Sequence, residues 1–365
     1  METSRLTLPL LLIAFSFLLT LSAQMTGIFK CSERGDSPST CRSLVGYSSK
    51  QATTYGNIQT LFAVKKLRSI LEANNLPLST QRTQGVNPNQ VVRVPIPCSC
   101  SNGTGVSNRT PVYTVKKGDT LYFIASEIFG GLVQYQRISD LNRIPDASEI
   151  DVGQRFWIPL PCSCDKLNGQ DVVHYAHVVK SGSSLGEIAA QFGTDNTTLA
   201  QLNGISGDAQ LLADYPLNVP LRACNSSVRA DSLDAKMLLP NSSYSITANN
   251  CIRCSCQASN NWTLSCEASQ LKPSSTWQTC PSPRCEGAES LFVGNTTNTS
   301  CGPRSCAYAG YSNQTILTAL SPDPCSGSGG SGPPGNYAST TLSSSFSYVV
   351  MLIQCALICM SSLAM

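Results

Sequence analysis

The chain has 365 residues, a length that allows two average domains or several small ones. It carries 25 Lys and Arg against 22 Asp and Glu, so its formal charge is only +3. That charge is too small for a nucleic-acid-binding protein that relies on phosphate contacts. The 18 cysteines and only two histidines argue against a cytosolic enzyme and against a zinc protein. The composition instead predicts a secreted, disulfide-linked surface protein that needs no cofactor and no metal.

The beginning of the sequence has the order of a secretory signal peptide. Arg5 precedes an apolar run over 6–21, and the small residues Ser22 and Ala23 follow it. The run is shorter than the roughly 20 residues that a membrane span needs. We therefore expect a signal peptide over 1–23 and entry into the secretory pathway.

The other end has the order of a signal for a glycosylphosphatidylinositol (GPI) anchor. No charged residue follows Asp323, and a Gly/Ser/Pro linker over 326–336 leads to a polar spacer and an apolar tail. Basic residues, which would hold a membrane span in place, do not follow the tail. The pattern predicts attachment at Asn336, with Ser331 and Gly335 as alternatives, and removal of a propeptide over 337–365. We expect the mature protein on the extracellular face of the plasma membrane.

Cysteines and glycosylation sequons fit this location. Loss of the tail removes Cys355 and Cys359 and leaves 16 cysteines, an even number that permits full pairing. The composition predicts about five Asn-x-Ser/Thr sequons by chance. The sequence contains nine, which begin at Asn102, Asn108, Asn196, Asn225, Asn241, Asn261, Asn295, Asn298 and Asn313.

The chain also contains an internal repeat. The motif Cys98-Ser99-Cys100 recurs 64 residues later as Cys162-Ser163-Cys164, and Cys224 follows Cys162 by 62 residues. A proline-containing segment rich in β-branched residues precedes each of these cysteines. Repeats of this size predict small stacked units that need covalent links between them, because each buries little surface alone.

The second and third copies predict a strand–helix–helix–strand unit, and thus an α+β fold. Short strands open at Tyr113 and His177, and second helices are expected over 133–141 and 197–202. The first copy is degenerate, with a strand over 44–47, a helical stretch over 58–70 and a stop at 75–77. The first helices carry matching apolar stripes at Leu121, Ile124, Ala125 and Ile128, and at Leu185, Ile188, Ala189 and Phe192.

The segment from Tyr113 to Leu121, Tyr-Thr-Val-Lys-Lys-Gly-Asp-Thr-Leu, resembles the opening of a LysM module. Three such units joined by Cys-x-Cys, between a signal peptide and a GPI signal, resemble the plant LysM GPI-anchored receptor proteins. The segments 74–80 and 308–315 resemble the peptidoglycan-sensing subgroup of that family, which is related to chitin elicitor-binding protein. The resemblance implies three tandem LysM modules cross-linked by disulfides. It places them at 31–100 (degenerate), 111–161 and 175–223, before a Cys-rich region over 224–325.

The resemblance also implies a function. The protein would bind N-acetylglucosamine (GlcNAc)-containing glycans, peptidoglycan first and chitin oligomers second, and would trigger innate immunity through a LysM receptor-like kinase. Homo- or hetero-oligomers are compatible with this role. Two alternatives are a non-signalling tether or scavenger of cell-wall glycans and a LysM-targeted glycan hydrolase. Paired carboxylates do not recur near the implied site, which disfavours the hydrolase.

The family's ligand groove lies between the loop after the first strand and the loop before the last strand. Ile144 is the strongest candidate contact, because it is an apolar residue between Arg143 and Pro145 on a loop. The family's disulfides imply the pairs Cys31–Cys100, Cys41–Cys164 and Cys98–Cys162. The first module lacks the Gly-Asp-Thr signature and is not expected to bind. Transferred to this chain, the groove residues are Gly118, Asp119, Thr120, Leu121, Asn142, Arg143, Ile144, Pro145, Gly182, Ser183, Ser184, Leu185, Asn203, Gly204 and Ile205.

Other candidate sites have plainer interpretations. Cysteines after Cys224 favour disulfides over zinc in a secreted chain, although the sequence leaves their pairing open. Trp262 and Trp277 are expected in a small disulfide-rich core, with sugar stacking as the alternative. His174 and His177 would point to opposite faces of a strand, which disfavours a metal site.

Overall fold

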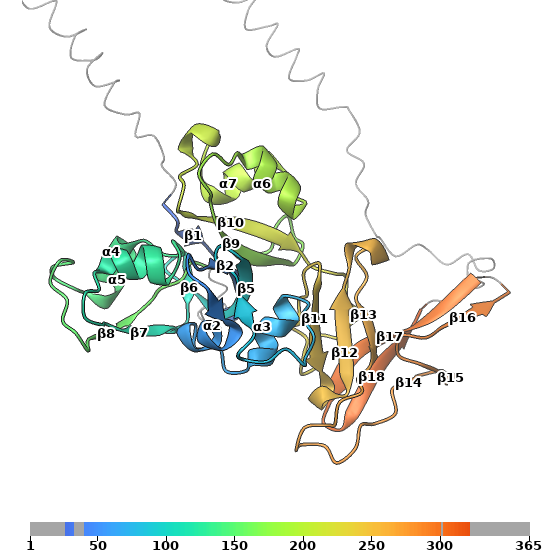
Figure 1. Cartoon of the computed structure of the whole chain (residues 1–365). Helices are drawn as coiled ribbons and strands as arrows, with labels where there is room; N and C mark the ends of the chain where they lie inside the picture. The colour runs from blue at the N-terminus through green and yellow to red at the C-terminus, as the bar shows by residue number, and fades with distance from the viewer. Residues whose placement is uncertain (1–25, 33–39, 301, 322–365) are drawn as a thin grey trace, which may run out of the picture. The chain divides into compact units, whose positions relative to one another are not determined.

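The computed structural model describes residues 26–32, 40–300 and 302–321 (Figure 1). The predicted signal peptide, the linker over 326–336, the anchor site Asn336 and the propeptide all lie outside these residues, as do Cys301 and Cys325. Within the described ranges, no helix has both the length and the apolar character needed to cross a membrane.

The first module is a complete strand–helix–helix–strand unit in spite of its degenerate sequence. The Thr54 hydroxyl accepts the Asn57 N–H at 3.1 Å and thereby caps its first helix. The single helical stretch expected over 58–70 is wrong in one respect, because Ala63 has a φ of 52° and divides it into two helices. The unit consists of β2 (Thr40–Ser48), α2 (Tyr55–Leu61), α3 (Leu67–Ala73) and β5 (Val91–Ser101), with a small ribbon of β3 (Thr53–Thr54) and β4 (Gly85–Val86).

The second and third modules follow the same order. Thr120 and Ser184 cap their first helices, and Glu187 completes a capping box in the third module. The predicted apolar stripes face the core. The second module has β7 (Val112–Thr114), α4 (Leu121–Phe123) continuing into a π-helical turn (Ile124–Ile128), α5 (Tyr135–Asn142) and β8 (Arg155–Trp157). The third has β9 (Val172–Val178), α6 (Leu185–Phe192), α7 (Asn196–Asn203), a 3-10 turn (Asp208–Gln210) and β10 (Pro216–Arg222).

The first and third modules share one sheet. Its strand order is β1-β6-β5-β2-β9-β10, where β1 is Phe29–Lys30 and β6 is Thr104–Ser107. Strand β2 runs parallel to β9, with Leu44 opposite Tyr175. The second module keeps a separate two-stranded sheet of β7 and β8. Pairing between β2 and β9 therefore joins modules that are not neighbours in sequence.

Two disulfides, Cys41–Cys164 and Cys98–Cys162, connect the first module to the end of the second, and a third, Cys31–Cys100, lies within the first module. All three are the pairs that the family resemblance implies. Cys41 and Cys98 lie opposite each other on β2 and β5, yet each bonds to a different cysteine of the motif that ends the second module. The sulfur atoms of Cys41, Cys98 and Cys164 lie within 4.8 Å of one another. Two disulfides therefore lie side by side, and their sulfur atoms are not the free thiolates that would bind a metal.

The described residues of the Cys-rich region form β-structure of their own around four further disulfides. Trp277 is buried and donates to the Asn313 carbonyl at 2.7 Å, and the half-buried Trp262 stacks on Arg222, which confirms their predicted place in this core. The disulfides are Cys224–Cys256, Cys251–Cys280, Cys254–Cys266 and Cys285–Cys306. The elements are β11 (Ser243–Thr247), β12 (Ile252–Cys256), β13 (Ser265–Ala268), β14 (Arg284–Cys285), β15 (Ala288–Phe292), β16 (Thr296–Thr299), β17 (Gly302–Ser312) and β18 (Thr315–Leu320), with 3-10 turns at Ala248–Asn250 and Ala258–Asn260.

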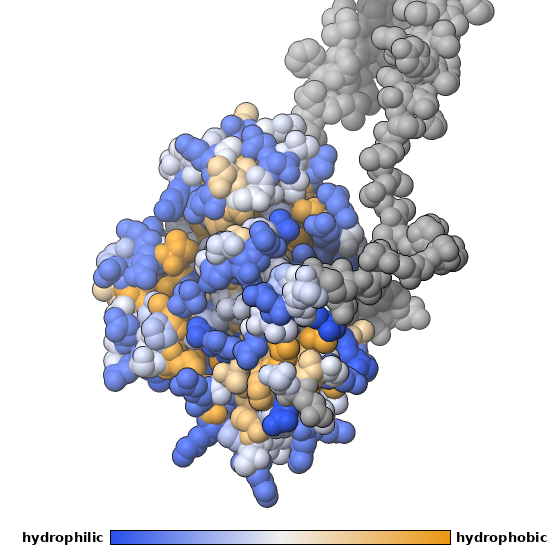
Figure 2. Space-filling view, turned by 90° about the vertical axis from the view of Figure 1, so that its right-hand side faces the viewer, coloured by the Kyte–Doolittle hydropathy of each residue, from blue (hydrophilic) through white to orange (hydrophobic). Residues whose placement is uncertain are grey.

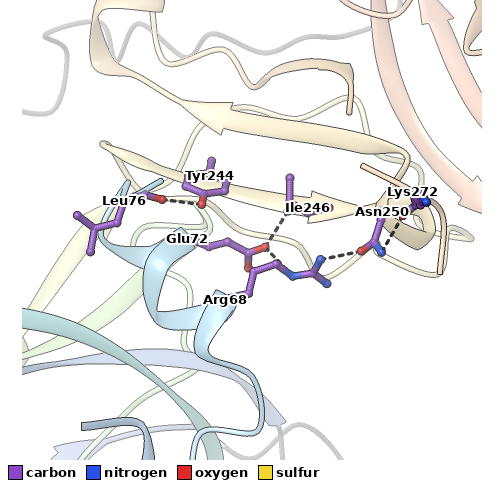
Figure 3. Close-up of polar contacts among 7 residues, drawn as sticks. All are labelled: Arg68, Glu72, Leu76, Tyr244, Ile246, Asn250 and Lys272. Carbon is purple, nitrogen blue, oxygen red and sulfur yellow. Dashed lines mark hydrogen bonds and ion pairs between the residues drawn. The ribbon is translucent and has the colours of Figure 1, made fainter. Parts of the chain in front are cut away.

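This region is docked on helix α3 of the first module (Figure 3). The buried Glu72 carboxylate accepts the Ile246 N–H at 3.1 Å and forms an ion pair with Arg68 at 3.6 Å. The Tyr244 hydroxyl donates to the Leu76 carbonyl at 2.7 Å. Burial raises the pKa of Glu72, and the bond from Ile246 opposes that rise. Polar contacts therefore fix the Cys-rich region against a module that is distant in sequence.

Candidate functional site

An asparagine at the end of the second helix ties each module together. In the second module, Asn142 donates to the carbonyls of Ile138 at 2.8 Å and Trp157 at 2.7 Å, and it accepts the Trp157 N–H at 2.9 Å. Asn203 makes the same three bonds in the third module, and Asn74 makes them in the first. The side-chain amides of the candidate residues Asn142 and Asn203 are therefore already hydrogen-bonded to backbone groups of their own module. Asn74 was not among the predicted site residues, and its separation of 19 residues from Arg93 differs from the 15 residues that separate the equivalent pairs in the other two modules.

The loop before helix α4 forms one side of the candidate groove in the second module. The Asp119 carboxylate accepts the Tyr113 hydroxyl at 2.9 Å and the Lys116 N–H at 2.8 Å. Burial and then the neighbouring Asp119 raise the pKa of Tyr113. Thr120 caps the helix, and Leu121 is buried in the core. These side chains hold the loop, so the backbone around Asp119 is what remains to face a ligand.

The turn after helix α5 forms the other side. Arg143 adopts left-handed backbone, with a φ of 55°, and is exposed, as is Pro145. Between them, Ile144 is half-buried, and its N–H donates to the Ser139 carbonyl at 3.0 Å. Ile144 is therefore a partly accessible apolar side chain on a hydrogen-bonded turn.

In the second module, backbone hydrogen bonds join the segment after the first strand to the loop before the last strand. The Val115 N–H donates to the Gln154 carbonyl at 2.9 Å, and the Gly153 N–H donates to the Val115 carbonyl at 2.9 Å. Gly118 has a φ of 89°, a conformation that side chains disfavour, and no atom outside its own neighbourhood lies within 4 Å of where a Cβ would stand. The loop is thus open to solvent at Gly118.

The third module closes its groove differently. The Leu185 N–H donates to the Asp208 carboxylate at 2.7 Å and thereby joins the two loops. Gly182 has positive φ, Ser183 lies beside the cap, and Gly204 ends helix α7 in left-handed backbone. Ile205, which occupies the place of Ile144, is only 6 % exposed. The third module therefore presents less apolar side chain to a ligand than the second.

The first module has a cavity of about 460 Å³ on the loop that leads from α3 to β4. The Gln84 carbonyl on this loop accepts the Tyr55 N–H at 3.2 Å, which places the loop beside helix α2. None of its lining residues is apolar: they are Ser79, Thr80, Gln81, Thr83, Gln84 and Gly85. The cavity lacks an apolar side chain comparable to Ile144.

Both histidines of strand β9 are buried and have partners that are not metals. His174 contacts the Asn218 side chain at 2.8 Å and the Asp165 carbonyl at 2.9 Å through its two ring nitrogens. The His177 ring packs edge-on against Phe192 at 5.1 Å. Burial, and then Lys180, lower the pKa of His177 to about 4.

The protein should lose stability in mild acid because of His177. The unfolded state binds a proton near pH 6.5 and the folded state only near pH 4, so stability falls as pH drops through this interval. We expect a loss of about 2 kcal/mol between pH 7 and pH 5 from this residue. Urea unfolding at both pH values measures it, and the variant His177→Phe should lose correspondingly less. An equal pH dependence in both proteins would contradict the assignment.

The predicted glycosylation positions are mostly at the surface. Eight of the nine sequon asparagines are exposed, and Asn241 is half-buried. The face shown in Figure 2 is largely hydrophilic, with its hydrophobic residues in separate groups. Use of the sequons stays a prediction, with Asn241 the least accessible position.

Comparison with known proteins identifies the repeated unit and extends to nearly the whole chain. The LysM domain matches residues 113–159 and 177–220. The chain is 69% identical over 363 residues to "LysM domain-containing GPI-anchored protein 2" of Arabidopsis thaliana, with 99% of each chain covered. It is 43% identical over 283 residues to "Chitin elicitor-binding protein" of Oryza sativa subsp. japonica, with 77% of each chain covered.

Among solved structures, the chain is similar to the ectodomain of a receptor like kinase at 20% identity, with a TM-score of 0.41 over 51% of this chain and 93% of that one. For the LYK3 ectodomain, the values are 21% identity and a TM-score of 0.42, over 50% and 90%. The relatives matched over most of their length carry names of anchored or binding proteins rather than enzymes. From its near full-length identity with one of them, the chain belongs to the plant LysM domain-containing GPI-anchored proteins.

Proposed function

We propose that this protein is a cell-surface receptor or co-receptor that binds GlcNAc-containing glycans in the groove of its second module. The observation that carries the proposal is the half-exposed Ile144 on the turn after α5. We assign the remaining groove residues of the second and third modules a supporting role, chiefly through their backbone.

The chemistry of the ligand suits this turn. Each sugar presents an acetamide whose methyl group needs a small apolar surface and whose N–H and C=O need hydrogen-bond partners. Ile144 offers the first, and backbone around Asp119 and Arg143 offers the second. A neutral polymer also fits a protein with a formal charge of +3.

Chitin oligomers are the better supported ligand, and peptidoglycan is the second candidate. The sequence by itself favoured the opposite order. The relative named for binding a chitin elicitor, 43% identical over 77% of each chain, supports chitin. Both ligands contain GlcNAc, so the same groove suits either, and one shallow groove gains from long ligands that bridge several sites.

A LysM receptor-like kinase is the proposed signalling partner. A protein held only by a GPI anchor at Asn336 has no cytoplasmic part, so a signal needs a second protein. Co-precipitation of such a kinase after chitin treatment supports this role. Loss of that complex, with intact immune responses in a deletion line, would favour the tether or scavenger instead.

The variant Ile144→Asp tests the site. A charge on the apolar surface should weaken binding of chitin oligomers at least tenfold, because the acetamide methyl loses its contact and a desolvated carboxylate replaces it. Isothermal titration with the purified full-length protein measures the effect.

Val112→Asp is the matched control. Val112 lies in the same module, is apolar and is 41 % exposed, but it is not part of the groove. Circular dichroism verifies that both variants are folded. If Ile144→Asp retains wild-type affinity, the groove is not the binding site.

A further inference from the structure

A cavity of about 300 Å³ lies on the seam between the second and third modules. Its volume is at the lower end of the range for small-molecule sites. None of the predicted groove residues lines it. Five segments form its walls: 26–28, Thr104 to Val106, the outer side of helix α5, Pro159 with Pro161, and Tyr215.

The walls of the seam cavity are fixed by hydrogen bonds and by close backbone packing. The Ser107 N–H donates to the Leu160 carbonyl at 2.9 Å, and the Gln134 side chain donates to the Asp214 carbonyl at 3.3 Å. A Cβ at position 105 would collide with the Cys162 carbonyl, so only glycine allows β6 to approach this closely. The disulfide Cys98–Cys162 also fixes the position of Cys162. The cavity is therefore preformed.

The lining combines polar and apolar groups. Helix α5 supplies the polar side chains of Gln136, Arg137 and Asp140, and its N-cap residue Gln134 supplies another. Ile28, the prolines and Tyr215 supply apolar surface. One carboxylate is too few for a divalent cation. A carboxylate beside the single arginine disfavours phosphate, and charged groups disfavour a lipid chain. A sugar ring, with hydroxyl groups on its edge and apolar C–H groups on its faces, matches both kinds of surface.

Arg137 gives the clearest indication of a ligand. Its side chain is half-buried, and it forms neither an ion pair nor a hydrogen bond with any residue that the structure describes. A guanidinium carries five N–H donors and no acceptor. A sugar hydroxyl or an acetamide carbonyl in the cavity would accept from it.

We propose that the seam cavity binds one N-acetylhexosamine residue. The sugar has two possible sources. One is an external chitin oligomer that extends from the groove of the second module, and this source rests on the proposed function. Asp140 lines the seam cavity, and Arg143 belongs to the groove. They are about one helical turn, or 5 Å, apart along the axis of helix α5, so a long oligomer can reach both sites. The other source is the chain's own glycan at Asn102, two residues before Thr104.

The variant Arg137→Ala tests the seam in the full-length glycosylated protein. For an external sugar, the affinity for the GlcNAc octamer should fall about tenfold while that for the trimer stays unchanged, because the groove occupies all sugars of the trimer and only the octamer has further sugars that extend into the seam cavity. For the chain's own glycan, both affinities stay unchanged, and native enzymatic release of the Asn102 glycan becomes about ten times faster. Arg155→Ala, which removes an exposed arginine of the same module, should change neither quantity.

The outcomes separate the two proposals. If Arg137→Ala changes neither octamer affinity nor glycan release, or if it weakens trimer and octamer equally, the seam site is wrong and the groove proposal stands. If the wild-type protein binds neither oligomer, the proposed function fails. The rate of release of the Asn102 glycan then still tests whether the seam cavity binds a sugar.

Discussion

Replacement of Cys98 and Cys162 together by alanine is expected to lower the free energy of unfolding by about 3 kcal/mol. The two cysteines are 1 % and 0 % exposed, and they are 64 residues apart. With Cys31–Cys100 and Cys41–Cys164 intact, however, the shortest loop that this bond closes has only about 14 residues, because it runs through both of those disulfides. The loss measured by urea unfolding should correspond to that short loop.

The same pair should contribute more once Cys31–Cys100 is absent. The shortest loop then has roughly 60 residues, and closure entropy predicts that the loss on removing Cys98–Cys162 grows by about 1 kcal/mol. Removal of Cys254–Cys266 is the control, because this bond lies in the Cys-rich region and closes 12 residues on either background. Strict additivity of the losses from removing Cys31–Cys100 and Cys98–Cys162 would contradict this account of how the disulfides act.

Both cysteines of a pair must be replaced in these variants. A single substitution at Cys162 leaves the Cys98 thiol beside the Cys41–Cys164 bond, where the sulfur atoms lie within 4.8 Å. A thiolate at that distance can attack the disulfide and change the pairing. Single variants would therefore report on exchange as well as on stability.

The variant Asn203→Ala is expected to lower the free energy of unfolding by about 3 kcal/mol. Its amide bonds to the Leu199 carbonyl at 2.8 Å, the Asn218 carbonyl at 2.9 Å and the Asn218 N–H at 2.7 Å. Asn218 is 1 % exposed, so water cannot replace the lost partner of its N–H. The cost of unpaired backbone groups dominates this estimate.

Gln201→Ala is the matched control for this variant, because Gln201 is exposed on the same helix two residues earlier. Its effect should stay within about 0.5 kcal/mol. Thermal and urea unfolding of the purified protein measure both. An equal small effect for the two variants would show that the asparagine does not hold helix and strand together.

Local features of the fold were predictable from the sequence because they depend on residues close together in the chain. The caps at Thr120 and Ser184 and the apolar stripes that follow them repeat at a fixed offset. In the first module the sequence located the unit but missed two details, because the cap at Thr54 lacks the Gly-Asp-Thr signature and Ala63 divides the helical stretch. Repetition therefore located all three copies, but it gave the details of only the two regular ones.

The candidate site was predictable only in part. Sequence identified the loops, but it could not separate the half-buried Ile144 from the buried Ile205, because burial depends on how each loop folds back on its core. It also listed Asn142 and Asn203 as ligand contacts, whereas their amides bond to a strand 15 residues away.

By itself, the sequence determined the repeated unit, its caps and stripes, and the resemblance that implies three LysM modules. Only the tertiary structure decided that β2 pairs with β9, that Glu72 accepts a hydrogen bond from the Cys-rich region, and that Arg137 lines a cavity between modules. The physical reason is the separation along the chain over which each kind of interaction acts. Helix caps and apolar periodicity act over a few residues, whereas these contacts join segments that are far apart in the chain and leave no periodic pattern in it.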